Sequence, residues 1–372
     1  MTDLELVTEL ITKARAAQQE FETYSQEQVD KAVRAVGKVI YDHGDELAKM
    51  AVEETRMGDY ASKIVKNTAK AKAVWYRMKG VKSRGIIERD ELSGIIKVSK
   101  PIGVIGCIPP TTNPTMTPMH NAMCALKGGN ALIVSPHPRA KKTSTVSCEL
   151  MRQALQEIGA PVDLIQVIPE PTIELSGLIM KLCDATIATG GPGMVKAAYS
   201  SGKPSFGVGA GNVQTIVDTD AVIADIAPMI AKSRTYDNGV LCTCEQCIHV
   251  QENSLDEMVQ AMQAQGAYYI SAPEKIAALR QTMFGTGSIN KDCVGASPVR
   301  IAEMAGLTVP AGTTMLMVRI DAYGKDETLA KEKLCPVICI TTYKTFEQAV
   351  ANAKCNLLNE GAGHSAVVHS HT

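Results

Sequence analysis

The chain has 372 residues, of which 45% are hydrophobic, and this exceeds the size that one hydrophobic core usually serves. We therefore expect two domains that share an interface. The 38 lysines and arginines against 39 aspartates and glutamates leave a formal net charge of -1, which gives no electrostatic argument for nucleic acid or an anionic membrane surface.

The amino-terminal residues show no basic segment leading into an apolar one, and no uncharged apolar run reaches the length of a bilayer span. We therefore expect neither a targeting segment nor a transmembrane segment. The eleven cysteines are too irregularly spaced for a disulfide framework, and most lie in apolar runs where thiols behave as small hydrophobes. A reducing cytoplasm is the expected location.

Residues 3–80 are predicted to be helical, because apolar side chains such as Val29, Val33, Val36 and Ile40 recur at helical spacing and no proline interrupts them. From about residue 84 onward, short β-branched runs alternate with helical stretches. Near-continuous apolar runs of this kind indicate a parallel sheet that is covered on both faces. The strands predicted here are 102–108, 131–134, 164–168, 185–188 and 213–217.

A second set of strand-like runs follows, with helices predicted at about 254–266, 273–283 and 345–356. We place the domain boundary near residues 237–242. Neither a low-complexity linker nor a repeat of fixed period is present, so the two halves should pack closely, with the chemistry between them. The strands predicted in this second set are 246–250, 315–320, 337–343 and 366–369.

A turn signal followed at once by a cysteine lies at this boundary, in Asp237-Asn-Gly-Val-Leu-Cys242-Thr-Cys-Glu-Gln246. A thiolate can add to a carbonyl carbon, and backbone amides around it can hold the resulting oxyanion. A buried structural thiol is the commoner fate of a cysteine, so spacing alone leaves both interpretations open. No metal is expected, because structural zinc sites draw paired ligands from two separated segments, whereas Cys242, Cys244, Cys247 and His249 lie within eight residues.

This cysteine segment resembles the active-site motif of the aldehyde dehydrogenase superfamily, and four further segments agree with that family in order and spacing. Ile108-Pro-Pro-Thr-Thr-Asn113 resembles the loop whose asparagine helps to hold the oxyanion. Ala131-Leu-Ile-Val-Ser-Pro-His-Pro-Arg139 resembles the strand and turn that contact the adenosine ribose. Thr189-Gly-Gly191 resembles the turn near the cofactor phosphates, and Glu332-Lys-Leu-Cys-Pro336 resembles the segment that binds the nicotinamide ribose.

Within the superfamily, the chain resembles the coenzyme A-acylating branch, especially succinate-semialdehyde and sulfoacetaldehyde dehydrogenases and the aldehyde dehydrogenase half of bifunctional acetaldehyde/alcohol dehydrogenases. Ser135-Pro-His-Pro138 replaces the Lys-Pro-Ala/Ser-Glu turn of hydrolytic members, and Gly361-Ala-Gly-His364 carries a histidine that the acylating branch shares. Glycine-rich Gly207–Asn212 stands where hydrolytic members carry a glutamate that activates water. A thiol ionises far more readily than water, so the missing base is consistent with coenzyme A as the acyl acceptor.

The resemblance implies an α/β fold of the aldehyde dehydrogenase type, with two Rossmann-like parallel-sheet domains and a helical amino-terminal preface. Residues 1–240 would form the cofactor-binding domain and residues 241–372 the catalytic domain. NADP or NAD would be the cofactor, and coenzyme A the co-substrate. The catalytic residues implied are Cys242, Asn113 and His364; the cofactor-binding residues are Ser135, Pro136, His137, Arg139, Thr189, Gly190, Gly191, Gly209 and Glu332; and the aldehyde pocket is lined by Thr111, Thr112, Thr243 and Cys244.

The substrate implied is a short aldehyde with an anionic tail, such as succinate semialdehyde or sulfoacetaldehyde. Alternatives are an acetaldehyde- or propionaldehyde-type acylating enzyme, a hydrolytic dehydrogenase, which would need a base that we do not find, and a non-catalytic protein on the same fold. Arg139, Lys141 and Lys142 would meet a 2′-phosphate or the 3′-phosphate of coenzyme A, or form a solvated helix start. Relatives continue for several dozen residues beyond the position of Thr372, and a homodimer is expected if that part is present.

Overall fold

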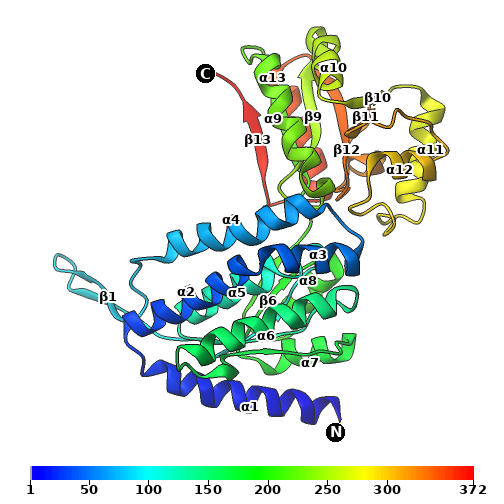
Figure 1. Ribbon diagram of the computed structural model, residues 1–372. Coiled ribbons are helices and arrows are strands. Elements are labelled where there is room, and N and C mark those ends of the chain that lie inside the picture. Colours follow the sequence, from blue (N-terminus) through cyan, green and yellow to red (C-terminus); the bar gives the residue numbers. More distant parts are fainter. Residues whose placement is uncertain (1) are drawn as a thin grey trace. The chain divides into compact units, whose positions relative to one another are not determined.

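Two compact units make up the computed structural model, which describes residues 2–372 (Figure 1). The first unit comprises residues 1–55 and 60–208, and the second comprises residues 56–59 and 209–372. The predicted boundary at residues 240/241 lies inside the second unit, because the chain from residue 209 already belongs to the second sheet. Within residues 2–372, every helix is too short or too polar to span a bilayer.

The first unit begins with the predicted helical preface, which the structure confirms. Its helices are α1 (Asp3–Glu22), α2 (Gln26–Asp42), α3 (Gly44–Thr55) and α4 (Tyr60–Met78). Capping boxes start the first two helices: Thr2 and Glu5 exchange hydrogen bonds at α1, as do Ser25 and Gln28 at α2. The predicted apolar face of α2 is fully buried against α5 and α6.

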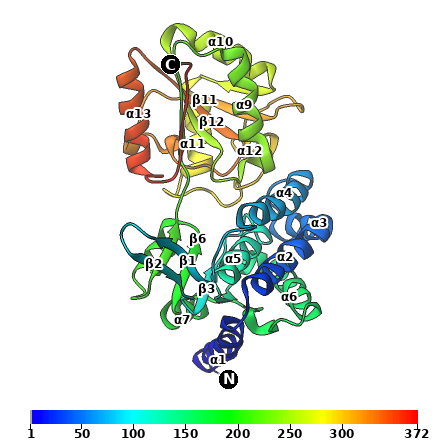
Figure 2. The ribbon, with the colours of Figure 1, turned by 90° about the vertical axis from the view of Figure 1, so that its left-hand side faces the viewer.

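A five-stranded parallel sheet, in the order β5-β4-β3-β6-β7, forms the centre of the first unit. Helices α5 and α6 cover one face, and α1 and α7 lie on the other (Figures 1 and 2). The strands are β3 (Val104–Ile108), β4 (Ala131–Val134), β5 (Ile165–Val167), β6 (Ala185–Thr189) and β7 (Ser205–Val208), and the helices are α5 (Met116–Lys127), α6 (Lys141–Glu157), α7 (Ile173–Leu182) and α8 (Pro192–Tyr199).

An antiparallel hairpin of β1 (Gly85–Asp90) and β2 (Ile95–Ser99) projects from the first unit (Figure 1). Its apolar residues are exposed, including Ile86, Ile95, Ile96 and Val98. This hairpin was not predicted from the sequence.

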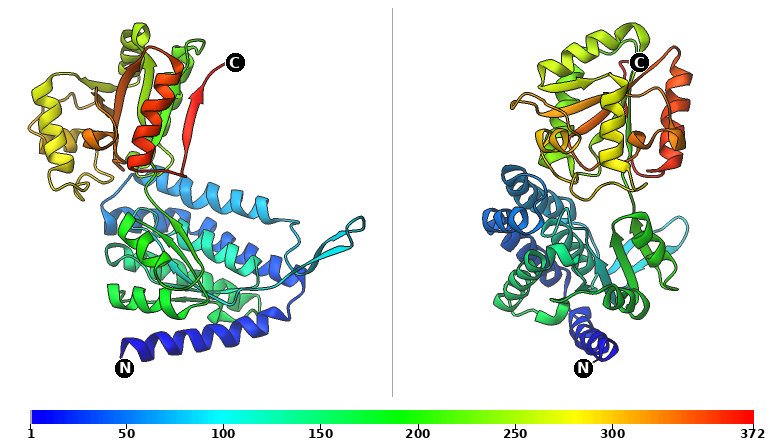
Figure 3. Two further views of the ribbon diagram at one scale, coloured as in Figure 1. Left: turned by 180° about the vertical axis from the view of Figure 1, so that it is seen from behind. Right: turned by 90° about the vertical axis from the view of Figure 1, so that its right-hand side faces the viewer.

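The second unit is built on a six-stranded parallel sheet in the order β10-β11-β12-β9-β8-β13 (Figure 3). Alternate residues of its strands enter different cores: Ile338 and Ile340 pack with α9 and α10, whereas Val337 and Cys339 pack with α11 and α12. Burial on both faces is why the strands read as continuous apolar runs. The strands are β8 (Val213–Val217), β9 (Glu245–Gln251), β10 (Ala267–Ile270), β11 (Met315–Arg319), β12 (Val337–Tyr343) and β13 (Ala366–His369), and the helices are α9 (Ile223–Thr235), α10 (Leu255–Ala264), α11 (Pro273–Phe284), α12 (Pro298–Met304) and α13 (Phe346–Asn359).

Strand β8 differs from its predicted grouping with the first set of strands. It pairs with β9 and β13, so it belongs to the second sheet. An apolar run identifies a strand but not its partner, and this is why the sequence placed β8 with its neighbours along the chain. Strands β7 and β10 were not predicted.

Candidate active site

The predicted site residues of the first unit lie in loops at the carboxyl edge of its sheet. The loop with Asn113 follows β3, the Ser135–Arg139 turn follows β4, and the Thr189–Gly191 turn follows β6. The chain winds outward from β3 through β4 to β5 and then returns to place β6 on the other side of β3. Ligands of doubly wound sheets bind at such a switch point, outside the carboxyl ends of the strands.

Helix α4 contacts the loop that carries Asn113 at three points. Lys63 Nζ donates to the Thr112 carbonyl oxygen at 3.3 Å, and Lys66 Nζ donates to Asn113 Oδ1 at 2.9 Å. One residue further along α4, Asn67 Oδ1 accepts a hydrogen bond from the Thr115 hydroxyl. The loop is therefore held by side chains from a helix that lies more than 30 residues earlier in the chain.

The residues of the turn after β4 differ in their exposure to solvent. Ser135 is fully buried, and its hydroxyl lies 2.9 Å from that of Ser176; Pro136 is also buried. His137 and Arg139 are exposed, and the Arg139 N–H donates to His137 Nδ1 at 3.1 Å. A cofactor at this turn would meet the main chain and the two exposed side chains rather than the Ser135 hydroxyl.

A carboxylate from α3 occupies the start of α6, just beyond this turn. Glu54 accepts hydrogen bonds from the backbone N–H groups of Lys142 and Thr143, both at 2.8 Å, and from the Thr143 hydroxyl at 2.7 Å. A helix start favours negative charge because its first N–H groups lack partners within the helix. The turn itself, Ser135–Arg139, has no acidic residue in its sequence, and the structure supplies one from a distant segment.

The glycine turn after β6 leads directly into α8. Gly191 is the N-cap of this helix without a side-chain cap, and the first turn of the helix carries no acidic residue. A methyl group built on Gly191 or Gly193 would meet no atom within 4 Å. This open main chain at a helix start fits a phosphate group of a dinucleotide.

In the second unit, a strained turn leads to Cys242. Asp237 and Asn238 both have positive φ (51° and 49°), a conformation that costs non-glycine residues about 1 kcal/mol or more each. Their side chains secure the turn, since the Asp59 N–H donates to Asp237 Oδ1 at 2.8 Å and Asn238 Nδ2 donates to the Gly295 carbonyl at 3.1 Å. Cys242 itself is partly exposed.

Thr243 and Cys244 follow the nucleophile candidate and differ in accessibility. Thr243 is exposed. Cys244 is fully buried, and its thiol donates to the Ser233 carbonyl of α9 at 2.8 Å. We therefore remove Cys244 from the predicted aldehyde pocket, because its side chain points into the core beneath α9.

Gly211 is the point at which three predicted site residues of the second unit meet. Its backbone N–H donates to Glu332 Oε1 at 2.8 Å. A methyl group on Gly211 would overlap the carbonyl oxygen of Cys242 and would lie 3.0 Å from Cε1 of His364. Cys242, His364 and Glu332 are therefore gathered around one backbone position that only glycine can fill. Gly209, two residues earlier, faces open space.

The Glu332 carboxyl lies in an environment that favours its neutral form. Burial raises its pKa to about 7, and the nearby Glu360 carboxylate adds to the rise, whereas the Gly211 N–H opposes it. The Glu332 backbone N–H donates to Glu360 Oε2 at 2.8 Å, which fixes the segment. The His364 ring contacts its neighbour in sequence, with Nδ1 3.0 Å from the Ser365 hydroxyl.

Three features of the site were not predicted from the sequence: the contact of Lys66 with Asn113, the cap that Glu54 provides, and the position of Gly211 between Cys242, His364 and Glu332. Lys66 and Glu54 are charged residues of amphipathic helices, where most such side chains are solvated, so periodicity offers no signal that singles them out. Gly211 lies in the glycine-rich segment that marks the missing base, and this was the available signal.

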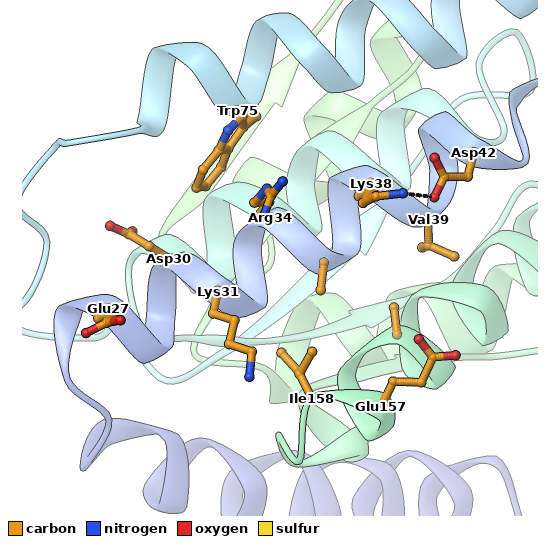
Figure 4. Close-up of a pocket in the computed structure, with 12 residues that line it drawn as sticks. Glu27, Asp30, Lys31, Arg34, Lys38, Val39, Asp42, Trp75, Glu157 and Ile158 are labelled. Carbon is orange, nitrogen blue, oxygen red and sulfur yellow. Dashed lines mark hydrogen bonds and ion pairs between the residues drawn. The ribbon is translucent and has the colours of Figure 1, made fainter.

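A groove of about 540 Å³ lies elsewhere on the first unit, against α2 (Figure 4). Both basic and acidic side chains line it, together with Trp75. Lys38 and Asp42 form an ion pair within it. No predicted site residue lines this groove. The predicted site residues of each unit therefore lie outside this groove.

The family profile described as "Aldehyde dehydrogenase family" matches residues 2–275. The chain belongs to the aldehyde dehydrogenase family. It is 45% identical over 364 residues to a succinate-semialdehyde dehydrogenase (acetylating) of Clostridium kluyveri, an alignment that covers 98% of this chain and 80% of that protein. It is 39% identical over 372 residues to a sulfoacetaldehyde dehydrogenase of Acholeplasma sp., with 98% and 76% covered. The predicted resemblance is thereby confirmed.

A solved structure of an acetylating aldehyde dehydrogenase from Geobacillus thermoglucosidasius superposes with a TM-score of 0.96 at 37% identity, over 99% of this chain and 82% of that one. This confirms the predicted fold class. An engineered glycolyl-CoA reductase of the same fold (TM-score 0.87, 29% identity, 98% and 82% covered) has NADP+ bound. The chain spans 42% of a bifunctional aldehyde-alcohol dehydrogenase of Escherichia coli, with 38% identity.

Proposed function

We propose that this protein is a coenzyme A-acylating aldehyde dehydrogenase, in which Cys242 is the nucleophile and NAD or NADP is the hydride acceptor. The observation that carries the proposal is the arrangement around Gly211, where the Cys242 main chain, His364 and Glu332 lie together. The relatives named above support the acylating reaction. The first unit would bind most of the cofactor and the second would carry the nucleophile; these units divide at residue 208/209, whereas the sequence placed the boundary at 240/241.

The residues in place suit a dinucleotide. Open main chain at Gly191 and Gly193 suits its phosphates, the turn at His137 and Arg139 suits its adenosine end, and the Glu332 carboxyl suits a ribose hydroxyl. When bound, the cofactor supplies an acceptor for the hydride of the substrate. Nucleophilic attack, stabilisation of the oxyanion and proton transfer are then carried out by side chains and main-chain groups of this chain.

The reaction begins when the Cys242 thiolate adds to the aldehyde carbon and forms a thiohemiacetal. Its oxyanion would be held by the Asn113 amide and the Cys242 backbone N–H. Loss of a hydride from the same carbon leaves a thioester on Cys242, a two-electron oxidation balanced by reduction of the cofactor. The coenzyme A sulfur then attacks the thioester, its proton passes to His364, and acyl-CoA leaves as the Cys242 thiolate is restored.

The glycine-rich segment Gly207–Asn212 supports coenzyme A rather than water as the acceptor. It offers no carboxylate that could deprotonate water, and the histidine beside Gly211 is sufficient for a thiol of moderate acidity. A hydrolytic dehydrogenase would need a base in this position.

For the aldehyde, we propose a short molecule with an anionic tail, such as succinate semialdehyde or sulfoacetaldehyde. The support is the identity to the two relatives that are named for these substrates. An acetaldehyde- or propionaldehyde-type enzyme is the second candidate, favoured by the likeness to a propionaldehyde dehydrogenase of Clostridium phytofermentans, with 31% identity and a TM-score of 0.88 over 98% of this chain and 83% of that one.

The decisive experiment measures aldehyde-dependent reduction of NAD and of NADP, with and without coenzyme A, for wild type and Cys242→Ala. Turnover that depends on both coenzyme A and Cys242 is expected, and the ratio of kcat/KM among succinate semialdehyde, sulfoacetaldehyde and propionaldehyde identifies the substrate class. Substantial turnover by a folded Cys242→Ala variant would refute the nucleophile. Turnover to free acid without coenzyme A would refute the acylating reaction. Light scattering on the same sample tests for the expected homodimer.

A further inference from the structure

Three buried polar residues share one face of α4 and contact the loop that bears Asn113. Lys63, Lys66 and Asn67 are spaced by three and one residues, and each is less than 5% exposed. Their partners are, in turn, the Thr112 carbonyl, the Asn113 side chain and the Thr115 hydroxyl. Lysine is seldom buried to this degree in proteins, so two buried lysines that contact the same loop need an explanation.

The contact of Lys66 differs from the others because it is made to the amide that the proposed reaction uses. An ammonium group has three N–H donors and no acceptor, so the Asn113 atom that faces Lys66 must be the oxygen Oδ1. The Nδ2 group is then directed away from Lys66, and one of its hydrogens reaches the Thr112 hydroxyl at 3.3 Å. The other hydrogen of Nδ2 remains available for an oxyanion.

We propose that Lys66 is a positioning residue for the oxyanion site: it fixes which end of the Asn113 amide faces the reacting carbonyl, and it strengthens that end as a donor. This rests on the function proposed above, in which Asn113 holds the oxyanion. An asparagine amide can turn over by half a rotation with little steric change, which would present an oxygen to the oxyanion and repel it. The Lys66 ammonium makes that second orientation unfavourable, because it would face an NH₂ group with no lone pair to accept its proton.

The charge on Lys66 also acts through the amide. A cation bound at Oδ1 draws electron density from the nitrogen, and hydrogen bonds polarised in this way strengthen one another in a low-dielectric interior. Nδ2–H therefore becomes a better donor to a developing negative charge. The benefit is largest in the transition state, where the oxygen carries the most charge, and so it should appear in kcat rather than in KM.

The test compares Lys66→Met with wild type in coenzyme A-dependent turnover of two aldehydes, succinate semialdehyde and the uncharged propionaldehyde. Methionine keeps the length and apolar stem of lysine but removes the donor and the charge. We expect kcat to fall by about tenfold to a hundredfold for both aldehydes, which is less than the factor of about 10²–10³ that loss of a whole oxyanion donor costs, because the Asn113 donor is still present. Lys66→Arg, which keeps a charged donor, should recover part of the loss.

A double-mutant cycle with Asn113→Ala shows whether the effect passes through the amide. In the Asn113→Ala background, Lys66→Met should change kcat by no more than about a factor of two, the scatter expected of uncoupled effects. Lys127→Met is the matched control, because Lys127 is another buried lysine of the first unit, ion-paired with Asp30 on α2 and remote from this loop. It should lower the melting temperature while leaving kcat unchanged.

Several outcomes would overturn the proposal. A loss limited to KM for succinate semialdehyde would make Lys66 an anchor for the anionic tail, and an undiminished loss in the Asn113→Ala background would make its effect independent of Asn113. If Lys66→Met does not fold, Lys66→Leu supplies a second variant without donor or charge for the same cycle, and wild-type kcat in that variant refutes the proposal. Wild-type kcat in Asn113→Ala would remove the oxyanion role from the proposed function itself, whereas loss in Asn113→Ala with wild-type kcat in Lys66→Met removes only the role of Lys66.

Discussion

The carboxyl group of Glu332 accepts a hydrogen bond from the backbone N–H of Gly211 at 2.8 Å, across 121 positions of sequence. This bond joins two segments. Glu332–Pro336 is expected to bind the nicotinamide ribose, and Gly207–Asn212 stands where hydrolytic relatives carry a glutamate that activates water. The main chain of Gly211 also lies against the Cys242 carbonyl and the His364 ring. Three segments of the second unit, those that contain Cys242, Glu332 and His364, therefore contact the main chain of one glycine.

Replacing Gly211 by alanine should abolish turnover. The added methyl group would overlap the Cys242 carbonyl oxygen, so the main chain of the nucleophile must move, and small displacements of a reacting group cost about 10²-fold in rate. Steady-state turnover and the melting temperature of the variant measure the two consequences. Gly312→Ala is the control, because Gly312 is exposed and a methyl group there meets no atom within 4 Å. Normal turnover in Gly211→Ala would contradict the close approach of these segments.

The stability of the protein should depend on pH through Glu332. Its pKa is raised from 4.5 to about 7, so between these values the folded state binds the proton more tightly than the unfolded state. The free energy of unfolding therefore falls as pH rises from about 4.5 to about 7 and is level above that, and the full effect is up to about 3 kcal/mol. Glu332→Gln removes this titration. Urea unfolding of both proteins from pH 5 to 8 should show that the free energy of unfolding of Glu332→Gln increases relative to that of wild type as pH rises. A difference in free energy that stays constant with pH would refute the raised pKa.

Glu54 should contribute to stability as a cap supplied from another helix. Glu54→Ala leaves the backbone N–H groups of Lys142 and Thr143 without their carboxylate, and loss of an N-cap costs about 1 kcal/mol. Urea unfolding measures the difference, which should shrink at high salt because part of it is electrostatic. The neighbouring Glu53 is exposed on the same helix, and Glu53→Ala should have little effect. Equal effects of the two substitutions would mean that the cap contributes nothing.

His364→Ala should slow thiolysis more than hydride transfer. The imidazole beside Gly211 is the group proposed to accept the coenzyme A proton, and general-base catalysis is worth about 10²–10⁴ in rate. Rapid mixing with aldehyde, nicotinamide cofactor and coenzyme A should still give a burst of reduced cofactor, followed by a steady-state rate lowered by at least about tenfold. His120→Ala on α5 is the control, since His120 is an exposed histidine of the first unit. Equal slowing of burst and steady state would remove the proposed role.

Much of the fold was predictable because its signals are local. The helical preface and strands such as β4 and β12 follow from apolar periodicity within a few residues, and the structure has them where they were predicted. The grouping of β8 with the first sheet was wrong for the opposite reason, since its partners β9 and β13 lie about 30 and 150 residues further along the chain. The exposed hairpin of β1 and β2 escaped prediction because its apolar residues are not buried in this chain.

The sequence by itself determined the residue types of the candidate site and their order, because a motif such as Asp237–Gln246 is contained in one segment. Only the tertiary structure decided which of these residues meet. It brought Glu332 and His364 to Gly211, turned Cys244 into the core, and set Lys66 against the Asn113 amide. These contacts join residues far apart in the chain, and the burial that makes them specific exists only after the chain has packed.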